Sequence, residues 1–335
     1  MVGVPRCDTG GTLTPYDTAR NTHAIPRGVG PRTGSDPGVA VRGATWSEPI
    51  CYAQPMTHDA RKRFAAPAKP KLRDQDASNS VFSSRAANPD LSKSKAKALD
   101  NERTAGLIAR ISDQQDRLYA LHQKKVLLVL QGMDTSGKDG LVRALFSGVN
   151  PMGVRAVAFK APTDAELAHD YLWRVHQHVP VKGEIAIFNR SHYEDVLITR
   201  VQGMIDADEC KRRYAQIRDF ERMLSETGTV IIKVFLHISH EEQRERLQER
   251  LDDPDKQWKF DPNDIEQRKK WDDYLRAYEN AIRETNTDYA PWYIVPADSK
   301  VHRNLAIASL LLETLEGMDL HYPPPHPDLS SFTVI

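Results

Sequence analysis

The sequence contains little cysteine and no long apolar run, and each absence excludes a class of protein. Its 335 residues include three cysteines, Cys7, Cys51 and Cys210, too few and too far apart for a disulfide scaffold or a Cys-x-x-Cys motif. No apolar stretch approaches the roughly 20 residues that span a bilayer, and the N-terminus lacks the apolar core of a signal peptide. We therefore expect a cytoplasmic protein without a membrane partner.

The chain also lacks net charge, since its 46 lysines and arginines balance 46 aspartates and glutamates. A generally basic, nucleic-acid-coating protein is therefore not expected, although a local basic cleft remains compatible with a neutral total. Hydrophobic residues make up 40% of the chain, enough for a globular core.

Composition divides the chain into three parts. Residues 1–92 are rich in Gly, Pro, Ser, Thr and Arg without an apolar period, so we expect a disordered extension. A binding tail is the alternative, but no motif supports it. Residues 93–322 form the expected domain, which opens with a helix over about 94–124, and residues 323–335 form a loose tail.

Strands and helices then alternate, which predicts an α/β fold with a largely parallel sheet. Two capping boxes, Thr163–Glu166 and Ser239–Glu242, predict helix starts; the first helix would place Leu167, Tyr171 and Val175 on one face. Asp261 followed by Pro262 predicts a third helix start. The predicted strands are KVLLVLQ, VRAVAFK, EIAIF, TVIIKVFLH and WYIVP.

Residues 239–286 are intensely charged, and two interpretations fit them. One is a solvated helical hairpin, the usual role of a charge run. The other is a lid that brings arginines and lysines over a phosphate site.

A glycine-rich turn joins the first predicted strand to a helix, with the spacing Gly132-x-x-x-x-Gly137-Lys138. This is the spacing and the strand-to-helix context of a phosphate-binding P-loop, in which backbone N–H groups and a lysine grip phosphate oxygens. The position that usually holds a Mg²⁺-binding Ser or Thr is Asp139. If Mg²⁺ is used, Asp134 inside the loop is the best replacement ligand. Asp139 is either a further ligand or a partner of the helix dipole.

Polar clusters follow the other predicted strands, where ligands gather in open parallel sheets. Lys160 follows one strand, and the run from Asn189 to Asp195 follows the next. For His192 and His237, taken singly, a structural role is the better interpretation. Together with the P-loop and the charged segment, these clusters predict phosphoryl transfer, which needs cations from several elements.

These motifs resemble those of the polyphosphate kinase 2 family. The segments GMDTSGKDG, FKAPT, GEIAIFNRSHYEDVL, FLHISHEEQRERL, DDPDKQWKF and APWYIVPAD carry the resemblance, in the family's order and spacing from about Leu91 to Tyr322. The resemblance implies a P-loop kinase fold similar to thymidylate kinase, with a five-stranded parallel sheet flanked by helices and a helical lid at about residues 239–286. The implied reaction is reversible, Mg²⁺-dependent transfer of a terminal phosphoryl group between inorganic polyphosphate and nucleotides; Mn²⁺ is an alternative ion.

The resemblance also assigns residues. Asp134, Lys138 and Arg190 would be catalytic, with Asp134 also a metal ligand. The expected phosphate-binding set is Gly132, Thr135, Ser136, Gly137, Asp139, Gly140, Lys160, Arg244, Arg250, Lys256 and Lys259. The second motif would comprise Asn189, Ser191, His192, Tyr193 and Glu194.

One position departs from the family pattern. Many relatives have Asp where this chain has Asn189, so a second metal carboxylate would be either Glu194 or Asp195. The variants GMD…GKDG and FNRSHYED resemble the subgroup that phosphorylates both AMP and ADP; GMP and GDP are further candidate acceptors. By analogy, the protein would be a homodimer or homotetramer.

Two other hypotheses compete. An ATP-dependent nucleoside monophosphate kinase explains the P-loop and the lid, but not Asp139 or the NRSHYED run. A non-enzymatic module that uses the P-loop as a nucleotide switch is the third. Base stacking by Trp258, Phe260 or Tyr193 is conceivable, but buried packing is the more common role for a single aromatic residue.

Overall fold

A five-stranded sheet organises residues 59–334, the part of the chain that the computed structural model describes. Its order is β2-β3-β1-β4-β5, and every pair is parallel. These are the five strands predicted from the apolar segments: β1 (Lys125–Gly132), β2 (Val154–Ala158), β3 (Ile185–Asn189), β4 (Thr229–His237) and β5 (Trp292–Pro296). The central strands are almost wholly buried, whereas edge strand β2 is partly exposed.

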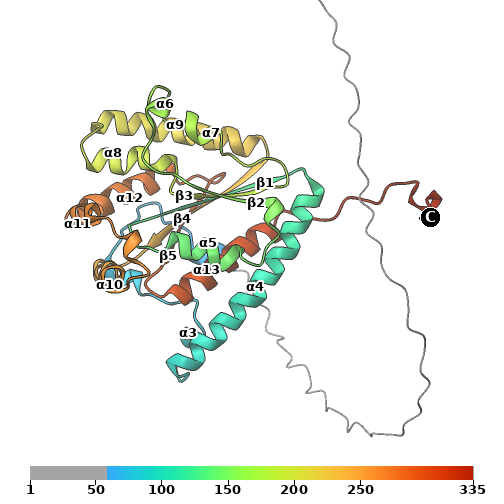
Figure 1. Ribbon diagram of the computed structural model, residues 1–335, viewed down its shortest axis with the longest axis horizontal. Coiled ribbons are helices and arrows are strands. Elements are labelled where there is room, and N and C mark those ends of the chain that lie inside the picture. The colour runs from blue at the N-terminus through green and yellow to red at the C-terminus, as the bar shows by residue number, and fades with distance from the viewer. Residues whose placement is uncertain (1–58, 335) are drawn as a thin grey trace, which may run out of the picture. The chain divides into compact units, whose positions relative to one another are not determined.

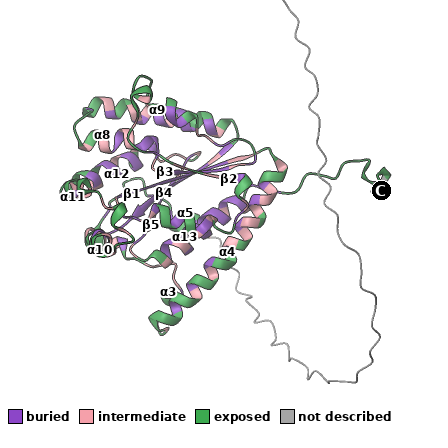
Figure 2. Cartoon of the chain, in the orientation of Figure 1, coloured by how far each residue is buried: buried purple, intermediate pink, exposed green. Residues whose placement is uncertain are grey.

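Helices cover both faces of this sheet (Figure 1). One face carries α4 (Lys93–Leu121), α5 (Lys138–Phe146) and α13 (Lys300–Glu316). The other carries α8 (Ile198–Val201), α9 (Ala207–Glu226) and α12 (Trp271–Thr285). Figure 2 shows that the sheet and the helix sides facing it are buried, while the outer sides are exposed. No helix among the described residues is long and apolar enough to cross a membrane.

The strand register brings the two predicted phosphate motifs together. Leu130 of β1 pairs with Asn189 of β3, and Gly132 pairs with Leu236 of β4. The P-loop therefore leaves β1 between the ends of β3 and β4. This is the carboxyl edge of the sheet, where parallel strands expose ligand-binding loops.

The capping box at Thr163 and Glu166 forms, but the long helix expected after it does not. Thr163 N–H donates to Glu166 at 2.7 Å and Glu166 N–H to Thr163 Oγ1 at 3.3 Å. Helix α6 (Asp164–Leu167) then ends, because Asp170 accepts the N–H groups that follow it and α7 (Trp173–His176) starts anew. Leu167 is consequently 65% exposed, so it does not share a buried face with Val175.

The charged segment divides into an exposed part and a buried part. Helices α10 (His240–Asp252) and α11 (Pro262–Arg268), joined through the short turn η3 (Gln257–Lys259), are mostly exposed. Helix α12 instead buries one face against the domain, including Tyr274, Tyr278 and Ile282. Ser239 caps α10 as predicted, but the Glu242 side chain binds Arg246 at 2.7 Å. The part that can act as a lid is therefore about residues 240–268, shorter than expected.

The expectation of disorder fails for residues 59–92, which form three short helices on the domain. These are α1 (Ala60–Phe64), α2 (Asp74–Ala77) and α3 (Ser84–Ala87). Buried side chains include Phe64 at 3% and Leu72 at 5% exposure. A few buried apolar residues and hydrogen bonds to the domain suffice here, although the composition alone favours disorder. The remainder of the expected extension, residues 1–58, lies outside the described residues.

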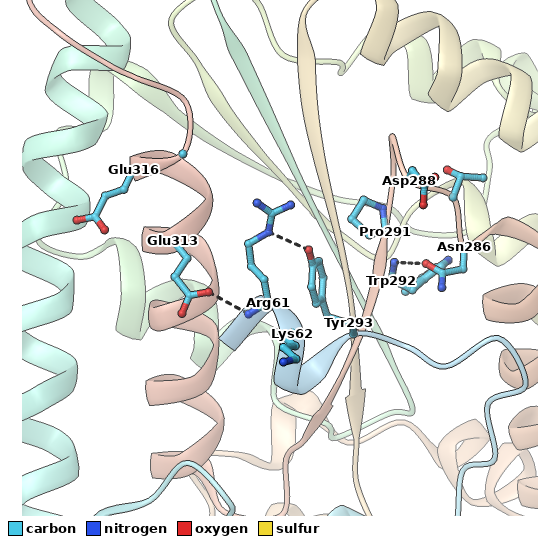
Figure 3. Close-up of a pocket in the computed structure, with 12 residues that line it drawn as sticks. Arg61, Lys62, Asn286, Asp288, Pro291, Trp292, Tyr293, Glu313 and Glu316 are labelled. Carbon is cyan, nitrogen blue, oxygen red and sulfur yellow. Dashed lines mark hydrogen bonds between the residues drawn. The ribbon is translucent and has the colours of Figure 1, made fainter. Parts of the chain in front are cut away.

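Hydrogen bonds fix the first of these helices to α13 and β5. Glu313 accepts backbone N–H groups from Asp59, Ala60 and Arg61 at 2.8–3.0 Å. Arg61 Nε in turn donates to the Tyr293 hydroxyl at 3.2 Å, and these residues line a cavity of about 870 Å³ (Figure 3). The cavity lies at the amino end of β5, so it is at the opposite edge of the sheet from the P-loop.

Candidate active site

The loop between β1 and α5 has the backbone of a phosphate cradle. Gly137 has a φ of 90°, and a Cβ there would lie 2.1 Å from Arg303 Nη1. Gly132 has a φ of 154°, and a Cβ there would lie 2.8 Å from the Leu236 carbonyl. Both positions therefore require glycine. The first N–H groups of α5 lack intrahelical acceptors, as at every helix N-terminus, so they are available to an anion.

Lys138 begins α5 and folds back over the loop. Its Nζ donates to the Gly132 carbonyl at 2.8 Å and to the Met133 carbonyl and Ser136 Oγ at 3.3 Å. Burial, reinforced by the Arg190 guanidinium, lowers the pKa of Lys138 to about 8. An anionic ligand at the loop would favour the charged form of this lysine.

Asp134 in the loop and Arg190 after β3 form an ion pair with an Nη2–Oδ1 distance of 2.7 Å. Arg190 adopts a left-handed backbone, with a φ of 64°, which is strained for a residue with a side chain. Its N–H donates to the Leu130 carbonyl at 3.0 Å. This geometry brings together the three residues expected to be catalytic: Asp134, Lys138 and Arg190.

The two positions that depart from common motifs lie in contact. The Asn189 amide donates to Asp139 Oδ1 at 2.5 Å. Asp139 is exposed in the first turn of α5, next to Gly140. Its carboxylate therefore both faces the positive end of the helix dipole and ties α5 to the second motif.

Glu194 and Asp195 have different surroundings. Burial raises the pKa of Glu194, while the charges of Arg190 and Lys138 oppose that shift. Asp195 instead lies 3.7 Å from Arg174, and Arg213 donates to its carbonyl at 2.9 Å. Of the two carboxylates, Glu194 is therefore the one influenced by the charges of the P-loop residues Lys138 and Asp134.

Asp264 of α11 is a nearby carboxylate that the sequence analysis missed. It pairs with Arg250 of α10 at 3.2 Å. Burial, with the Asp134 charge as the next cause, raises the pKa of Asp264 to about 6. In the sequence, Asp264 follows the Asp261-Pro262 helix start, where an acidic residue is common in the first helical turn. Its position therefore did not suggest a role in the site.

Two arginines support the loop from behind: Arg246, one of the cations expected from the charged segment, and Arg303, which the sequence analysis missed. Arg246 of α10 donates to the Thr135 carbonyl at 2.9 Å and to the Ala297 and Asp298 carbonyls at 2.8 and 2.9 Å. Arg303 of α13 donates to the Gly137 carbonyl at 3.2 Å. Burial, and next the charge of Arg246, lower the pKa of Arg303 to about 10. For Arg303, the position in the helix after β5 is the sequence signal that marks it.

Several predicted phosphate ligands face other groups. Arg244 pairs with Glu241, and Lys256 pairs with Glu249 and Asp253, all on exposed surface. Lys259 lies with its Nζ 5.0 Å from the ring centre of Trp258. Trp258 is 78% exposed, contrary to the expected buried packing, whereas Tyr193 is fully buried. Lys160 is exposed beyond the end of β2.

The remaining predicted residues are buried around the loops. Ser136, Ser191, His192 and Tyr193 are fully buried, and Thr135 is 9% exposed. The Thr135 hydroxyl is buried without a hydrogen-bond partner, so it has unused capacity for a phosphate oxygen. His237, also buried, contacts the Arg73 carbonyl at 2.8 Å, which agrees with a structural role.

Within residues 59–334, no three Asp, Glu, His or Cys side chains are arranged to hold a metal by themselves. The donors present nevertheless suit Mg²⁺. This ion commonly binds through one or two carboxylates together with substrate phosphates. Asp134 is partly exposed beside the cradle, and Glu194 shares its environment.

Comparison with known proteins agrees with this geometry. Residues 93–323 match polyphosphate kinase 2 (PPK2). The AMP/ADP-polyphosphate phosphotransferase of Meiothermus ruber is 57% identical over 224 residues, which cover 67% of this chain and 84% of that protein. The ADP-polyphosphate phosphotransferase of Rhodopseudomonas palustris is 44% identical, over 66% of this chain and 80% of that protein.

A solved structure extends the comparison to the fold. The crystal structure of polyphosphate kinase 2 from Arthrobacter aurescens TC1 superposes with a TM-score of 0.69 at 43% identity, covering 80% of this chain and 95% of that chain. Its similarity supports the P-loop kinase architecture expected from the motifs. The chain belongs to the polyphosphate kinase 2 family.

Proposed function

We propose that this protein reversibly transfers a terminal phosphoryl group between inorganic polyphosphate and a nucleotide, converting AMP to ADP and ADP to ATP. The observation that carries the proposal is the convergence of the backbone cradle, Lys138 and Arg190 at one point. Family membership and the activity named for the Meiothermus ruber relative support both acceptors.

Charge neutralisation is the main chemical demand of this reaction. An oxygen of the acceptor's terminal phosphate is already anionic, so it can attack the phosphorus without a general base. The phosphorus–oxygen bond to the rest of the polyphosphate breaks, and the shortened chain leaves with that oxygen. Lys138, Arg190 and the N–H groups of α5 would stabilise the charge on the transferred group.

A divalent cation, Mg²⁺ or alternatively Mn²⁺, would neutralise phosphate charge and orient the reacting oxygens. We assign its protein ligands to Asp134 and Glu194. Asp195 is the less suitable candidate because it lies beside Arg174. The Asp134–Arg190 pair would hold both side chains in place before the substrates arrive.

The test is to incubate the purified chain with long-chain polyphosphate, Mg²⁺ and either AMP or ADP, with no ATP added. We expect ADP from AMP and ATP from ADP, quantified by chromatography. GMP and GDP, assayed alongside, measure base selectivity. Failure to form any phosphorylated nucleotide would refute the proposal. A parallel reaction with ATP and AMP but no polyphosphate identifies an ordinary monophosphate kinase if it alone forms product. Assembly as a dimer or tetramer and a cytoplasmic location remain predictions.

A further inference from the structure

A buried polar network lies beneath the second motif, outside the residues assigned to phosphate or metal. Its centre is Lys233, in the middle of β4. The Lys233 ammonium donates to Glu221 Oε2 of α9 at 2.6 Å, to the Thr285 carbonyl of α12 at 2.7 Å and to the Tyr193 hydroxyl at 3.0 Å. Lys233, Glu221, Tyr193 and Thr285 are all 0% exposed.

Nearly every donor and acceptor in this network is used. Lys233 has three N–H donors and three acceptors. Glu221 Oε1 lies 2.8 Å from the Tyr193 hydroxyl and 3.2 Å from His192 Nε2. The Thr285 hydroxyl donates to the Ala281 carbonyl at 2.6 Å and accepts from Trp292 Nε1 at 2.9 Å. His192 Nδ1 is buried without a partner, but the bonds that are made favour one arrangement of His192 and Tyr193 and penalise others.

Stability alone does not account for the pair of charges. Burying an ion pair costs desolvation, and apolar side chains of similar volume often give an equally stable or more stable protein. Burial by itself would raise the pKa of Glu221, but the Lys233 charge and the His192 hydrogen bond outweigh it and hold that pKa below its usual range. The two charged groups therefore serve to hold neighbouring side chains in place.

The network is hydrogen-bonded to the segment that carries Arg190 and Glu194. Its members His192 and Tyr193 lie between these two residues in the chain, within the turn η2 (His192–Val196). On the other side, Ser191 Oγ donates to the side-chain oxygen of Gln131 in β1 at 3.1 Å and accepts from Tyr193 N–H at 3.2 Å. Bonds to β1 and to the network thus hold the turn from both sides, while Arg190 keeps its strained left-handed backbone.

We propose that Glu221 and Lys233 are positioning residues for phosphoryl transfer: by fixing His192 and Tyr193, they hold Arg190 and Glu194 at the P-loop. This inference rests on the proposed function. Neither residue touches the cradle, and both act through the turn above them. Thr285, at the end of α12, connects the same network to the helix that follows the lid.

The test replaces both charges together with apolar side chains, in the full-length double variant Lys233→Met/Glu221→Leu. We expect an unchanged melting temperature, a kcat that falls roughly 10- to 100-fold, as small misplacements of reacting groups produce, and a KM for ADP within about twofold of the wild-type value. Tyr193→Phe, which removes one hydroxyl, should lower kcat in the same direction. It serves as the second variant if the double variant does not fold.

A cycle with Arg190→Ala separates positioning from a general loss of structure. If the pair acts through Arg190, adding Lys233→Met/Glu221→Leu to Arg190→Ala should reduce kcat by a smaller factor than it does in the wild-type background, because coupled residues are non-additive and only the effect on Glu194 remains. The matched control is Arg222→Met/Asp219→Leu. This variant removes an exposed ion pair on α9, the helix that carries Glu221, and should leave kcat unchanged.

Three outcomes would overturn the inference. The Lys233→Met/Glu221→Leu variant could retain the wild-type kcat, or it could lower kcat by the same factor in the Arg190→Ala background as in the wild type. The third outcome is a fall in kcat across the variants that parallels the fall in their melting temperatures. The wild-type assay reports separately on the proposed function. If the wild-type protein forms no nucleotide product from polyphosphate, the proposed function fails, whereas wild-type activity with fully multiplicative variants rejects only the positioning role.

Discussion

Asn189 donates its side-chain amide to the Asp139 carboxylate, which joins the end of β3 to the first turn of α5. Each residue departs from a common pattern: Asp139 replaces the hydroxyl residue of many P-loops, and Asn189 replaces an aspartate. Considered together, the two departures are compatible, because an amide satisfies a carboxylate that a second carboxylate would repel. Arg190, the next residue, pairs with Asp134 in the P-loop.

Asn189→Asp should therefore make the enzyme more dependent on divalent cation. Two carboxylates in contact repel unless a cation lies between them. A charge-assisted hydrogen bond is worth about 1.5–3 kcal/mol, so we expect turnover at low Mg²⁺ to fall roughly 10- to 100-fold and to recover at high Mg²⁺. Rates measured across a Mg²⁺ titration check this. Asn189→Ala is the control, since it removes the bond without adding charge and should show no such recovery. A constant ratio of Asn189→Asp to wild-type rates at all Mg²⁺ concentrations would contradict the explanation.

Lys138→Ala should lower kcat by at least roughly 10²-fold, since removing one preorganised electrostatic contact typically has that effect. The measurement is the initial rate of ATP formation from ADP and polyphosphate. Lys269→Ala is a suitable control, because that lysine is 65% exposed and pairs with Glu266 on α11. A Lys138→Ala enzyme with near wild-type turnover would show that the loop is not the phosphate site.

The pKa of Lys138, lowered to about 8, predicts a pH dependence. The lysine binds phosphate in its charged form, which predominates below that pKa. The value of kcat/KM for polyphosphate should therefore decline as the pH rises through about 8, because this quantity reports the free enzyme. In the kcat profile the decline should begin at higher pH, because bound phosphates stabilise the ammonium. If the two profiles decline at the same pH, a different group controls binding.

The sequence predicted the sheet well because its signals are local. Each apolar strand is marked by its own residues, and Gly132, Gly137 and Lys138 fall within one short turn. The same reasoning failed for residues 59–92, where Phe64 and Leu72 are isolated apolar residues without a period. The segment is held by partners that lie far along the chain, Glu313 for the start of α1 and Glu279 for the Leu72 N–H, and composition does not reveal such partners.

The cations of the charged segment show a second limit. Sequence analysis grouped Arg244 with Arg250, but α10 turns Gln243, Arg246 and Leu247 inward and leaves Arg244 in solvent. The segment is so rich in charge that its apolar period is too weak to establish which side faces the core. Arg303 was missed for a related reason, because its carbonyl partner Gly137 lies 166 positions away.

This difference in orientation predicts different effects of two equivalent substitutions on one helix. Arg250→Ala removes the partner of Asp264, a carboxylate already under the influence of Asp134. We expect its KM for polyphosphate to rise about tenfold, equivalent to about 1.4 kcal/mol. Arg244→Ala breaks only an exposed pair and should change KM less than about twofold. Steady-state kinetics of both variants give the two KM values for polyphosphate. An equal rise in KM for Arg244→Ala and Arg250→Ala would mean that Arg244 reaches the substrate.

Truncation should distinguish the two parts of the N-terminal region. Removing residues 1–58 should leave activity intact, whereas removing residues 1–91, which retains the α4 N-cap Ser92, should destabilise the domain. The larger deletion exposes the surfaces that Phe64 and Leu72 cover, and burial of each such side chain contributes about 1.5–3 kcal/mol. We therefore expect the free energy of unfolding to fall by about 3–6 kcal/mol, measured by urea denaturation of both truncated proteins. Glu313→Ala in the full-length chain is the milder test, because that carboxylate accepts the N–H groups of two α1 residues and of its N-cap, Asp59. Equal stability of the two truncated proteins would mean that residues 59–91 pack on the domain without contributing to its stability.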